Sequence, residues 1–394
     1  MGEARSRQRP ATNPRRGAGE PAHSPRPRCD RVRAMSALVL PSVELLSPYE
    51  TGKPLDELAR ELGVTDAVKL ASNENPLGPS PRALEAARRA LESVHLYPDG
   101  AAYRLRERLA AVHGVTMEEI VQGNGSNELL DLIVHAFATP GSHIVFADPA
   151  FVVYKLAALA YGVPFTAVPL RDLRHDLEAM AAAVTPKTRL LFIANPNNPT
   201  GTHVGRAAVE RLLRELPPEV IVVMDEAYIQ YADAADFPDS MRLRGLRERL
   251  LVLRTFSKIY GLAGFRVGYA VGPVQLIDYL NRVRAPFNVS ALAQAAAVAA
   301  LDDAEHVEKS RALNLRERDR LTRELTRLGL SVAPSQANFV LVDVGRPARP
   351  VYDALLRKGV IVRPFGNLPT SLRVTIGTER ENQRFLDSLS AVLA

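Results

Sequence analysis

Lys258 is the residue whose type and setting point most directly to chemistry. It ends the segment Thr255–Lys258, which follows the apolar run Leu251–Leu253, and it is one of only seven lysines among 50 lysines and arginines. Most cationic positions are arginine, so a lysine among small and apolar neighbours has a chemical reason to be there. Only a primary amine forms an imine with an aldehyde, and burial lowers its pKa toward the reactive neutral form. Taken alone, the position also suits an ordinary surface lysine.

Two further segments place polar residues after apolar runs. Asn195–Gly201, with three asparagines, two prolines and a glycine, follows the run Leu190–Ala194. Asp225 comes directly after Val222–Met224. Each has a structural alternative, because the first would form a rigid turn in any protein and an acid after a strand often caps a helix. Their order along the chain, together with Lys258, favours one site built from successive strand ends.

The elements that would position these residues alternate between helical patterns and short apolar runs from about residue 80 to 275. Such alternation predicts a mostly parallel sheet covered by helices on both faces, which binds ligands at the carboxyl ends of its strands. The expected helices are Ala83–Leu91, Tyr103–Val112 and Glu128–Phe137, and the expected strands are His143–Phe146, Phe165–Val168, Leu190–Ile193, Val220–Met224, Leu251–Leu253 and Val267–Val271.

The C-terminal part follows a different pattern, which predicts a smaller α+β domain. After the alanine-rich stretch Ala291–Ala300, a long charged helix is expected at Ala304–Leu328. Its apolar side would carry Leu313, Leu321, Leu325 and Leu328. The elements expected after it are strands at Phe339–Val342, Val360–Val362 and Leu372–Ile376 and a helix at Pro350–Lys358.

The net charge of +6 lies entirely in residues 1–34, which carry nine arginines against three acids. This segment also holds five prolines and few large apolar residues, so we expect a disordered tail and not a basic folded surface. We interpret it as a dispensable extension or a misassigned start, with an RNA-binding or targeting arm as the alternative.

Several classes of protein are disfavoured by what the sequence contains. Cys29, the only cysteine, lies in the tail, which argues against disulfides and thiol chemistry in the folded part and fits the cytosol. No membrane-spanning apolar run, secretory signal, metal-binding histidine spacing, phosphate-binding P-loop or serine nucleophile elbow occurs in the sequence. We therefore expect no metal and no membrane or nucleic-acid partner.

From about Pro48 to its end, the chain resembles the fold-type I pyridoxal-phosphate aminotransferases, and within them the histidinol-phosphate aminotransferase branch. The Asn-Pro-Thr-Gly and Ser-Lys segments are shared by many aminotransferases and indicate only the cofactor. Ser47–Pro54 and Ala71–Gly78 are more specific to the branch. The segments that carry the resemblance are Ser47–Pro54, Ala71–Gly78, Tyr97-Pro98, Gly123–Glu128, Asn195–Gly201, Asp225–Tyr228, Ser257-Lys258 and Pro286–Val289.

The resemblance implies a catalytic role for three residues. Lys258 would hold pyridoxal 5'-phosphate as a Schiff base and, once released by substrate, would move the proton as a base. Asp225 would pair with the ring nitrogen and keep it protonated, so that the ring accepts electrons. Tyr228, with Asn198, would hydrogen-bond the phenolic oxygen of the cofactor.

The resemblance also implies the remaining cofactor ligands. Gly125, Ser126 and Asn127 precede an expected helix whose N-terminus favours an anion, although an ordinary helix cap is the alternative. Asn127 departs from the commoner family pattern, in which an acid is frequent. The other residues implied to bind the cofactor are Ser257 and Arg266 at the phosphate and Phe151 stacked on the ring.

For the substrate, the resemblance implies that Arg373 binds a carboxylate or phosphate, with Arg363, Tyr49 and Asn75 as weaker candidates. Tyr97 resembles the residue that reaches the partner subunit's cofactor phosphate, which implies a homodimer with shared sites. We expect a disordered tail at 1–34, a large cofactor domain at 75–300, and a small domain built from 35–74 and 301–394.

The expected reaction is reversible amino transfer between L-histidinol phosphate and 2-oxoglutarate in the cytoplasm, as a step of histidine biosynthesis. The main alternative is an aromatic amino acid aminotransferase, because imidazole and phenyl pockets differ little in volume. Decarboxylation of a phosphorylated amino acid is a further alternative. A transcription regulator with an aminotransferase-like domain is disfavoured, because residues 1–34 are too short and polar for a winged helix-turn-helix.

Overall fold

The computed structural model of the chain describes residue 39 and residues 41–48 and 52–394. The basic segment 1–34 and Tyr49 lie outside the described residues. In the described part, no helix combines the length and the apolar character that crossing a lipid bilayer requires.

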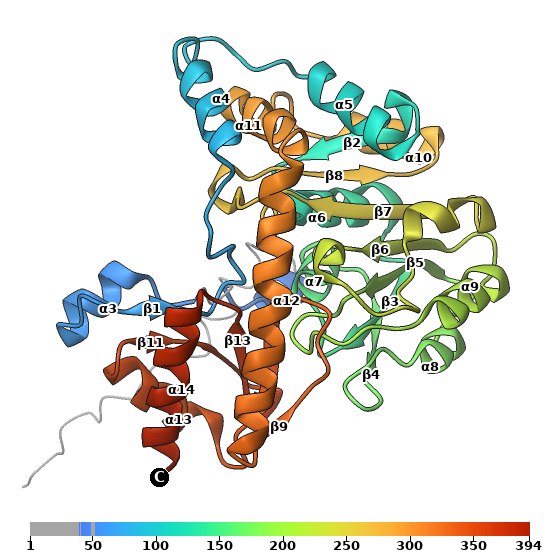
Figure 1. The fold of residues 1–394 in the computed structure, drawn as a ribbon. Coiled ribbons are helices and arrows are strands. Elements are labelled where there is room, and N and C mark those ends of the chain that lie inside the picture. The colour runs from blue at the N-terminus through green and yellow to red at the C-terminus, as the bar shows by residue number, and fades with distance from the viewer. Residues whose placement is uncertain (1–38, 40, 49–51) are drawn as a thin grey trace, which may run out of the picture.

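A seven-stranded sheet with the order β2-β8-β7-β6-β5-β3-β4 forms the larger half of the molecule (Figure 1). The strand β8 runs antiparallel to both of its neighbours, and the other strands of the sheet run in one direction. The mostly parallel sheet expected from the sequence is therefore confirmed. The strands are β2 (Ile120–Gly123), β3 (His143–Asp148), β4 (Phe165–Pro169), β5 (Thr188–Ala194), β6 (Ile221–Asp225), β7 (Leu250–Thr255) and β8 (Gly268–Val271).

Helices cover both faces of this sheet, which explains its continuous apolar strands. Along β5, Leu190 and Phe192 pack into one core with α6 (Gly125–Phe137), α7 (Val153–Ala160) and α10 (Val274–Val283). The alternate side chains of β5 pack into a second core with α8 (Leu177–Ala182) and α9 (Arg206–Glu215). At the β2–β8 edge, a third core joins α4 (Pro81–Leu91), α5 (Tyr103–His113) and α11 (Ala291–Leu301).

The smaller half contains an antiparallel sheet with the order β12-β13-β10-β9. A two-stranded parallel sheet pairs β1 with β11, so the N-terminal segment lies beside C-terminal elements (Figure 1). The elements are α3 (Leu55–Leu62), β1 (Val68–Lys69), α12 (Ala304–Arg327), β9 (Ser331–Val332), β10 (Phe339–Asp343), α13 (Ala348–Arg357), β11 (Val360–Ile361), β12 (Arg363–Phe365), β13 (Leu368–Thr375) and α14 (Glu379–Leu393). The division into domains at 35–74, 75–300 and 301–394 stays a proposal.

The buried face of α12 differs from the expected apolar side. Leu321 and Leu325 are buried, but Leu328 is 43% exposed and Leu313 is only partly buried. Much of the buried face is polar instead, because its side chains find partners in other elements. The polar residues buried along α12 are His306, Ser310, Asn314, Glu317 and Arg318.

Two features near the expected site lay beyond the sequence patterns. The strand β2 was not expected, and α6 begins at Gly125, three residues before the predicted start. The short helical elements of the described chain are α2 (Pro41–Glu44), η1 (Met117–Glu119), η2 (Ile229–Tyr231), η3 (Ser240–Leu246) and η4 (Ala263–Phe265).

Candidate active site

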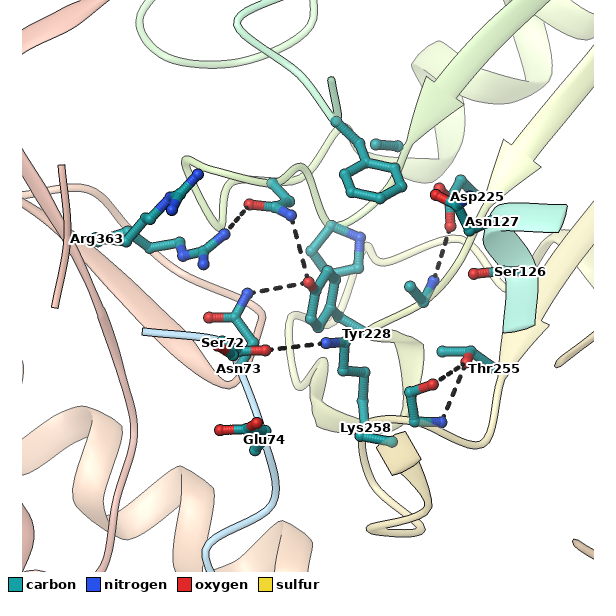
Figure 2. A pocket seen from close by; sticks show the side chains of 18 of the residues that line it. Ser72, Asn73, Glu74, Ser126, Asn127, Asp225, Tyr228, Thr255, Lys258 and Arg363 are labelled. Carbon is teal, nitrogen blue, oxygen red and sulfur yellow. Dashed lines mark hydrogen bonds between the residues drawn. The ribbon is translucent and has the colours of Figure 1, made fainter. Parts of the chain in front are cut away.

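A cavity of about 340 Å³ lies where the carboxyl ends of β5, β6 and β7 face the smaller half of the molecule. Figure 2 shows that its side chains come from both halves. Residues that follow three separate strands meet here, as their positions in the sequence suggested. The predicted site residues that line it are Ser126, Asn127, Phe151, Asn198, Asp225, Tyr228, Ser257, Lys258, Arg266, Arg363 and Arg373.

Lys258 points its amine across the cavity, where Nζ donates a hydrogen bond to Ser72 O at 3.2 Å (Figure 2). The same nitrogen lies 5.7 Å from the centre of the Tyr228 ring. Burial, followed by the positive charge of Arg373, lowers the pKa of Lys258 to about 8. The neutral, nucleophilic form of this amine is therefore far more populated near neutral pH than it is for an ordinary lysine.

Asp225 ends β6 and is almost fully buried. Its Oδ2 accepts a hydrogen bond from the Tyr154 hydroxyl at 2.7 Å, and its Oδ1 accepts one from the backbone N–H of Ala227 at 3.3 Å. Burial raises the pKa of Asp225 to about 6. A buried carboxylate held in this way suits a cationic ligand group, which would offset the cost of its burial.

Tyr228 is fixed by two asparagines. Its hydroxyl accepts hydrogen bonds from Asn73 Nδ2 at 3.0 Å and from Asn198 Nδ2 at 3.5 Å. Asn198 Oδ1 in turn accepts a hydrogen bond from Arg373 Nη1 at 2.6 Å. The expected phenolic-oxygen ligands are thus coupled directly to the expected substrate arginine.

Asn73, which the sequence analysis missed, occupies the cavity wall where Asn75 was expected. Asn75 does not line the cavity, since its amide donates to Ile259 O at 2.8 Å and to Ser310 Oγ at 2.9 Å. Both belong to the segment that carried the resemblance, but Asn73 takes a left-handed backbone conformation with φ +56°. That turn, which the sequence pattern did not reveal, selects which asparagine faces the cavity.

An anion cradle forms around the N-terminus of α6. Gly125 opens the helix with φ +77°, and a Cβ added to it would collide with the guanidinium of Arg266. Arg266 therefore lies directly against the helix end, and its Nη1 donates to Ala263 O at 3.1 Å. A helix N-terminus and a guanidinium that meet in this way favour a phosphate.

Two hydroxyl groups at the end of β7 complete the cradle. Thr255 Oγ1 donates to Ser257 Oγ at 3.0 Å and accepts from the Ser257 N–H at 3.1 Å. Both side chains line the cavity, together with Ser126. Thr255 was missed in the sequence because it belongs to the strand and looks like an ordinary β-branched residue.

The substrate side of the cavity is cationic. Arg373, buried on β13, donates from Nη2 to Ala71 O at 2.6 Å, and its guanidinium lies 5.5 Å from the centre of the Phe365 ring. Arg363 on β12 pairs in register with Arg373. A second cavity of about 490 Å³ shares Arg363, Arg373, Asn198 and Phe151 with the first, so the cationic end leads into further space.

Tyr97 lies away from this cavity and is 83% exposed. Its ring stacks on Phe287 with 4.8 Å between centroids. Its expected contact with a partner subunit stays a prediction, as does the role of Tyr49, which lies outside the described residues.

The donor set of the cavity fits pyridoxal 5'-phosphate. Arg266 and the α6 N-terminus suit the phosphate, Asp225 suits a protonated ring nitrogen, and Lys258 suits an aldehyde. Phe151, on the cavity wall, offers an aromatic surface for a ring. Among the described residues, no group of three or more histidine, cysteine, aspartate or glutamate side chains is arranged to hold a metal ion.

Comparison with known proteins identifies the family of the chain. The family model described as Aminotransferase class I and II matches residues 65–389. The histidinol-phosphate aminotransferase of Moorella thermoacetica is 53% identical over 353 residues, which cover 89% of this chain and 91% of that protein. Histidinol-phosphate aminotransferase 2 of Pseudomonas aeruginosa is 53% identical over 362 residues, covering 91% and 98% respectively. The structure of histidinol-phosphate aminotransferase from Sinorhizobium meliloti in complex with pyridoxal-5'-phosphate matches with a TM-score of 0.83 and 29% identity, covering 91% of this chain and 99% of that one.

Proposed function

Because the chain belongs to the Aminotransferase class I and II family, we propose that it transfers the amino group of L-histidinol phosphate to 2-oxoglutarate. The products are imidazole acetol phosphate and L-glutamate, and the reaction belongs to histidine biosynthesis. The observation that carries the proposal is the convergence of Lys258, Asp225 and Arg266 on one cavity. The relatives of about 50% identity, all named for this reaction, support the substrate.

Pyridoxal 5'-phosphate, when bound, supplies an aldehyde that takes up the amino group and a ring that accepts electrons. Arg266 and the N-terminus of α6 would hold its phosphate, with the hydroxyls of Thr255 and Ser257. Asp225 would hold a proton at the ring nitrogen.

Lys258 would serve in two protonation states. Its neutral amine would hold the aldehyde of the cofactor in the resting enzyme and, once released, would take up a proton from the substrate carbon, and the protonated amine would then give that proton back. A base of this kind works best when its pKa lies near the working pH, and the pKa of Lys258 is lowered to about 8. Tyr228, fixed by Asn73 and Asn198, would hold the phenolic oxygen.

Arg373 and Arg363 would bind the anionic end of each substrate. A guanidinium presents two parallel N–H donors, which suit the phosphate of histidinol phosphate and a carboxylate of glutamate equally well. The buried Arg373 is already oriented by Ala71 and Asn198, so little side-chain freedom is lost when an anion binds.

We further propose a cytoplasmic homodimer. The support for the dimer is a set of exposed apolar side chains in the segment that follows α4, which ends with Tyr97 beside Phe287. Exposed apolar surface gathered in one segment is typical of a protein interface. The exposed apolar residues of this segment are Val94, Leu96 and Tyr97, and they are flanked by the exposed Leu91 at the end of α4 and Tyr103 at the start of α5.

A panel of amino donors tests the substrate. We expect kcat/KM for histidinol phosphate to exceed that for unphosphorylated histidinol by about 100-fold or more, because an unpaired guanidinium charge costs several kcal/mol, and to exceed that for phenylalanine as well. Lys258→Ala serves as the inactive control. If phenylalanine or tyrosine were turned over as well as histidinol phosphate, the aromatic aminotransferase would replace this proposal.

A further inference from the structure

The hydroxyl of Tyr154 contacts Asp225, although Tyr154 does not itself line the cavity. Tyr154 belongs to α7, is 1% exposed, and donates to Asp225 Oδ2 at 2.7 Å. No motif in the sequence singled it out. Its position next to the carboxylate gives it an influence on the charge of Asp225.

The ring of Tyr154 is held by aromatic neighbours. It stacks on Phe192 with 5.0 Å between centroids and an interplanar angle of 13°, and it meets the edge of Phe151 at 5.9 Å and 86°. Phe192 belongs to β5 and Phe151 lines the cavity. The hydroxyl is therefore aimed at one carboxylate oxygen by packing on two sides, and the same ring supports the proposed stacking residue.

A hydrogen bond donated to a carboxylate stabilises its charged form. Burial and the neighbouring charge of Asp225 hold the pKa of Tyr154 well above its usual value, so this hydroxyl remains a donor at every working pH. The other titratable groups near this pair are Glu226 and Lys258, whose charges act on Asp225, and Tyr228, which acts on Tyr154. The hydrogen bond from Tyr154 lowers the pKa of Asp225 and so opposes the effect of burial.

We propose that Tyr154 is a positioning residue whose hydroxyl orients Asp225 and keeps the shared proton on the ring nitrogen of the cofactor. The proton between a carboxylate and a ring nitrogen can reside on either partner. Without the donated hydrogen bond, the carboxylate attracts the proton more strongly, and the ring loses the positive charge that makes it accept electrons. This inference rests on the proposed role of Asp225.

The test is Tyr154→Phe in the holoenzyme loaded with pyridoxal phosphate that carries ¹⁵N at the ring nitrogen. We expect the ¹⁵N NMR signal to move toward that of an unprotonated ring, and kcat to fall about tenfold or more with KM changed less than about twofold. Tyr154→Met, which fills the space flexibly without a donor, should show the same displaced signal even if the phenylalanine variant folds poorly.

The matched control is Tyr161→Phe. Tyr161 closes the same helix and donates to Asp131 Oδ2 at 3.0 Å outside the cavity, so its loss should leave the ring signal and kcat at wild-type values. A conservative variant, 3-fluorotyrosine at position 154, keeps the donor and should retain the protonated signal.

The inference is wrong if the ¹⁵N signal of the ring is unchanged in both Tyr154→Phe and Tyr154→Met. It is also wrong if Tyr161→Phe lowers kcat as much as these two variants do. Asp225→Asn separates the two levels of the proposal. If the signal moves in Asp225→Asn and stays in Tyr154→Phe, the role of Asp225 stands and that of Tyr154 falls. If it stays in Asp225→Asn, the proposed role of Asp225 itself is wrong.

Discussion

At the scale of single residues, Lys258 owes its reactivity to its surroundings. Burial lowers its pKa most, and the charge of Arg373 lowers it further, whereas the charge of Glu74 raises it. Glu74 and Arg373 both line the cavity, so they face the amine across the same small space. The neutral fraction of the amine therefore depends on two neighbours of opposite sign.

Substituting these two neighbours should shift the reactivity of Lys258 in opposite directions. The neutral amine is the form that reacts with the aldehyde, so the rate at which the apoenzyme takes up pyridoxal phosphate should rise with pH through about 8. Arg373→Gln removes a positive charge and should move the midpoint to higher pH, whereas Glu74→Gln removes a negative charge and should move it lower. Stopped-flow absorbance measures the rate. Movement of both midpoints in one direction would contradict this electrostatic account.

The sequence predicted many of the side chains that face the cavity, but it missed side chains that hold them in place. Lys258, Asp225 and Asn198 follow apolar runs, and the ends of parallel strands meet, so local pattern was enough. Tyr154 reaches Asp225 across 71 positions of the chain, and Asn73 reaches Tyr228 across 155 positions. Their roles depend on packing between elements, which no local pattern encodes.

At the scale of elements, the first residue of α6 makes the geometry of the anion cradle possible. Gly125 is the first helical residue, and its missing Cβ leaves the space that Arg266 occupies. The helix N-terminus and the guanidinium can then address one phosphate together.

Gly125→Ala should displace Arg266 and weaken the cradle. The new Cβ would collide with the guanidinium, and φ +77° strains any residue with a side chain. We expect the Kd for pyridoxal phosphate to rise roughly 10- to 100-fold, the value of one charge-assisted hydrogen bond. Fluorescence titration of the apoenzyme measures it. Gly245→Ala, where an added Cβ would meet nothing within 4 Å, is the control, and equal affinities in the two variants would refute the cradle.

The long helix α12 is fastened by buried polar pairs as well as leucines. Glu317, 1% exposed, accepts hydrogen bonds from Asn382 Nδ2 of α14 at 2.9 Å and from Arg320 Nε at 3.0 Å. Arg318 pairs with Asp233 at 2.7 Å, beyond the end of β6. The helix is thus tied to both halves of the molecule (Figure 1).

Glu317→Ala should lower the free energy of unfolding by about 2–4 kcal/mol, because it leaves a buried amide and a guanidinium without their acceptor. Chemical denaturation of the apoenzyme measures the change. The exposed Glu308 of the same helix provides the control, and Glu308→Ala should cost less than about 0.5 kcal/mol. Similar losses in the two variants would show that helix propensity, and not the buried network, sets the cost.

The fold class expected from the sequence is confirmed, and the strands of the large sheet were predicted to within about two residues at most ends. These strands are apolar runs because both faces of the sheet are buried, so they can be predicted from the sequence without knowledge of tertiary contacts. The buried face of α12 could not be predicted, because Glu317 and Arg318 look like surface residues until their partners in other elements are known. The strand β2 was too short to stand out beside the glycine segment that follows it.

At the scale of the whole molecule, the segment from residue 71 to 73 links the two halves beside the cavity. Asn73 N–H donates to Thr375 Oγ1 at 2.9 Å, and Arg373 Nη2 reaches Ala71 O. The segment from residue 71 to 73 thereby joins β13 to the wall that also holds Tyr228. The proposed substrate arginines of the C-terminal part are thereby held together with the proposed cofactor residues from the middle of the chain.

In the proposed dimer, the segment that follows α4 packs against the second copy, and Leu96→Asp tests this contact. Leu96 is 62% exposed beside Tyr97, and a charge there should prevent burial of the apolar segment against a second copy. We expect sedimentation velocity to show a dimer for the wild type and a monomer for the variant.

Because Tyr97 is proposed to reach the partner's cofactor phosphate, the monomer should also bind pyridoxal phosphate about tenfold or more weakly. Leu328→Asp is the control, since Leu328 is an exposed leucine at the far end of α12 and its charge should leave the dimer intact (Figure 1). A Leu96→Asp protein that stays dimeric would place the interface elsewhere, and a monomer with unchanged cofactor affinity would show that Tyr97 does not complete the partner's site.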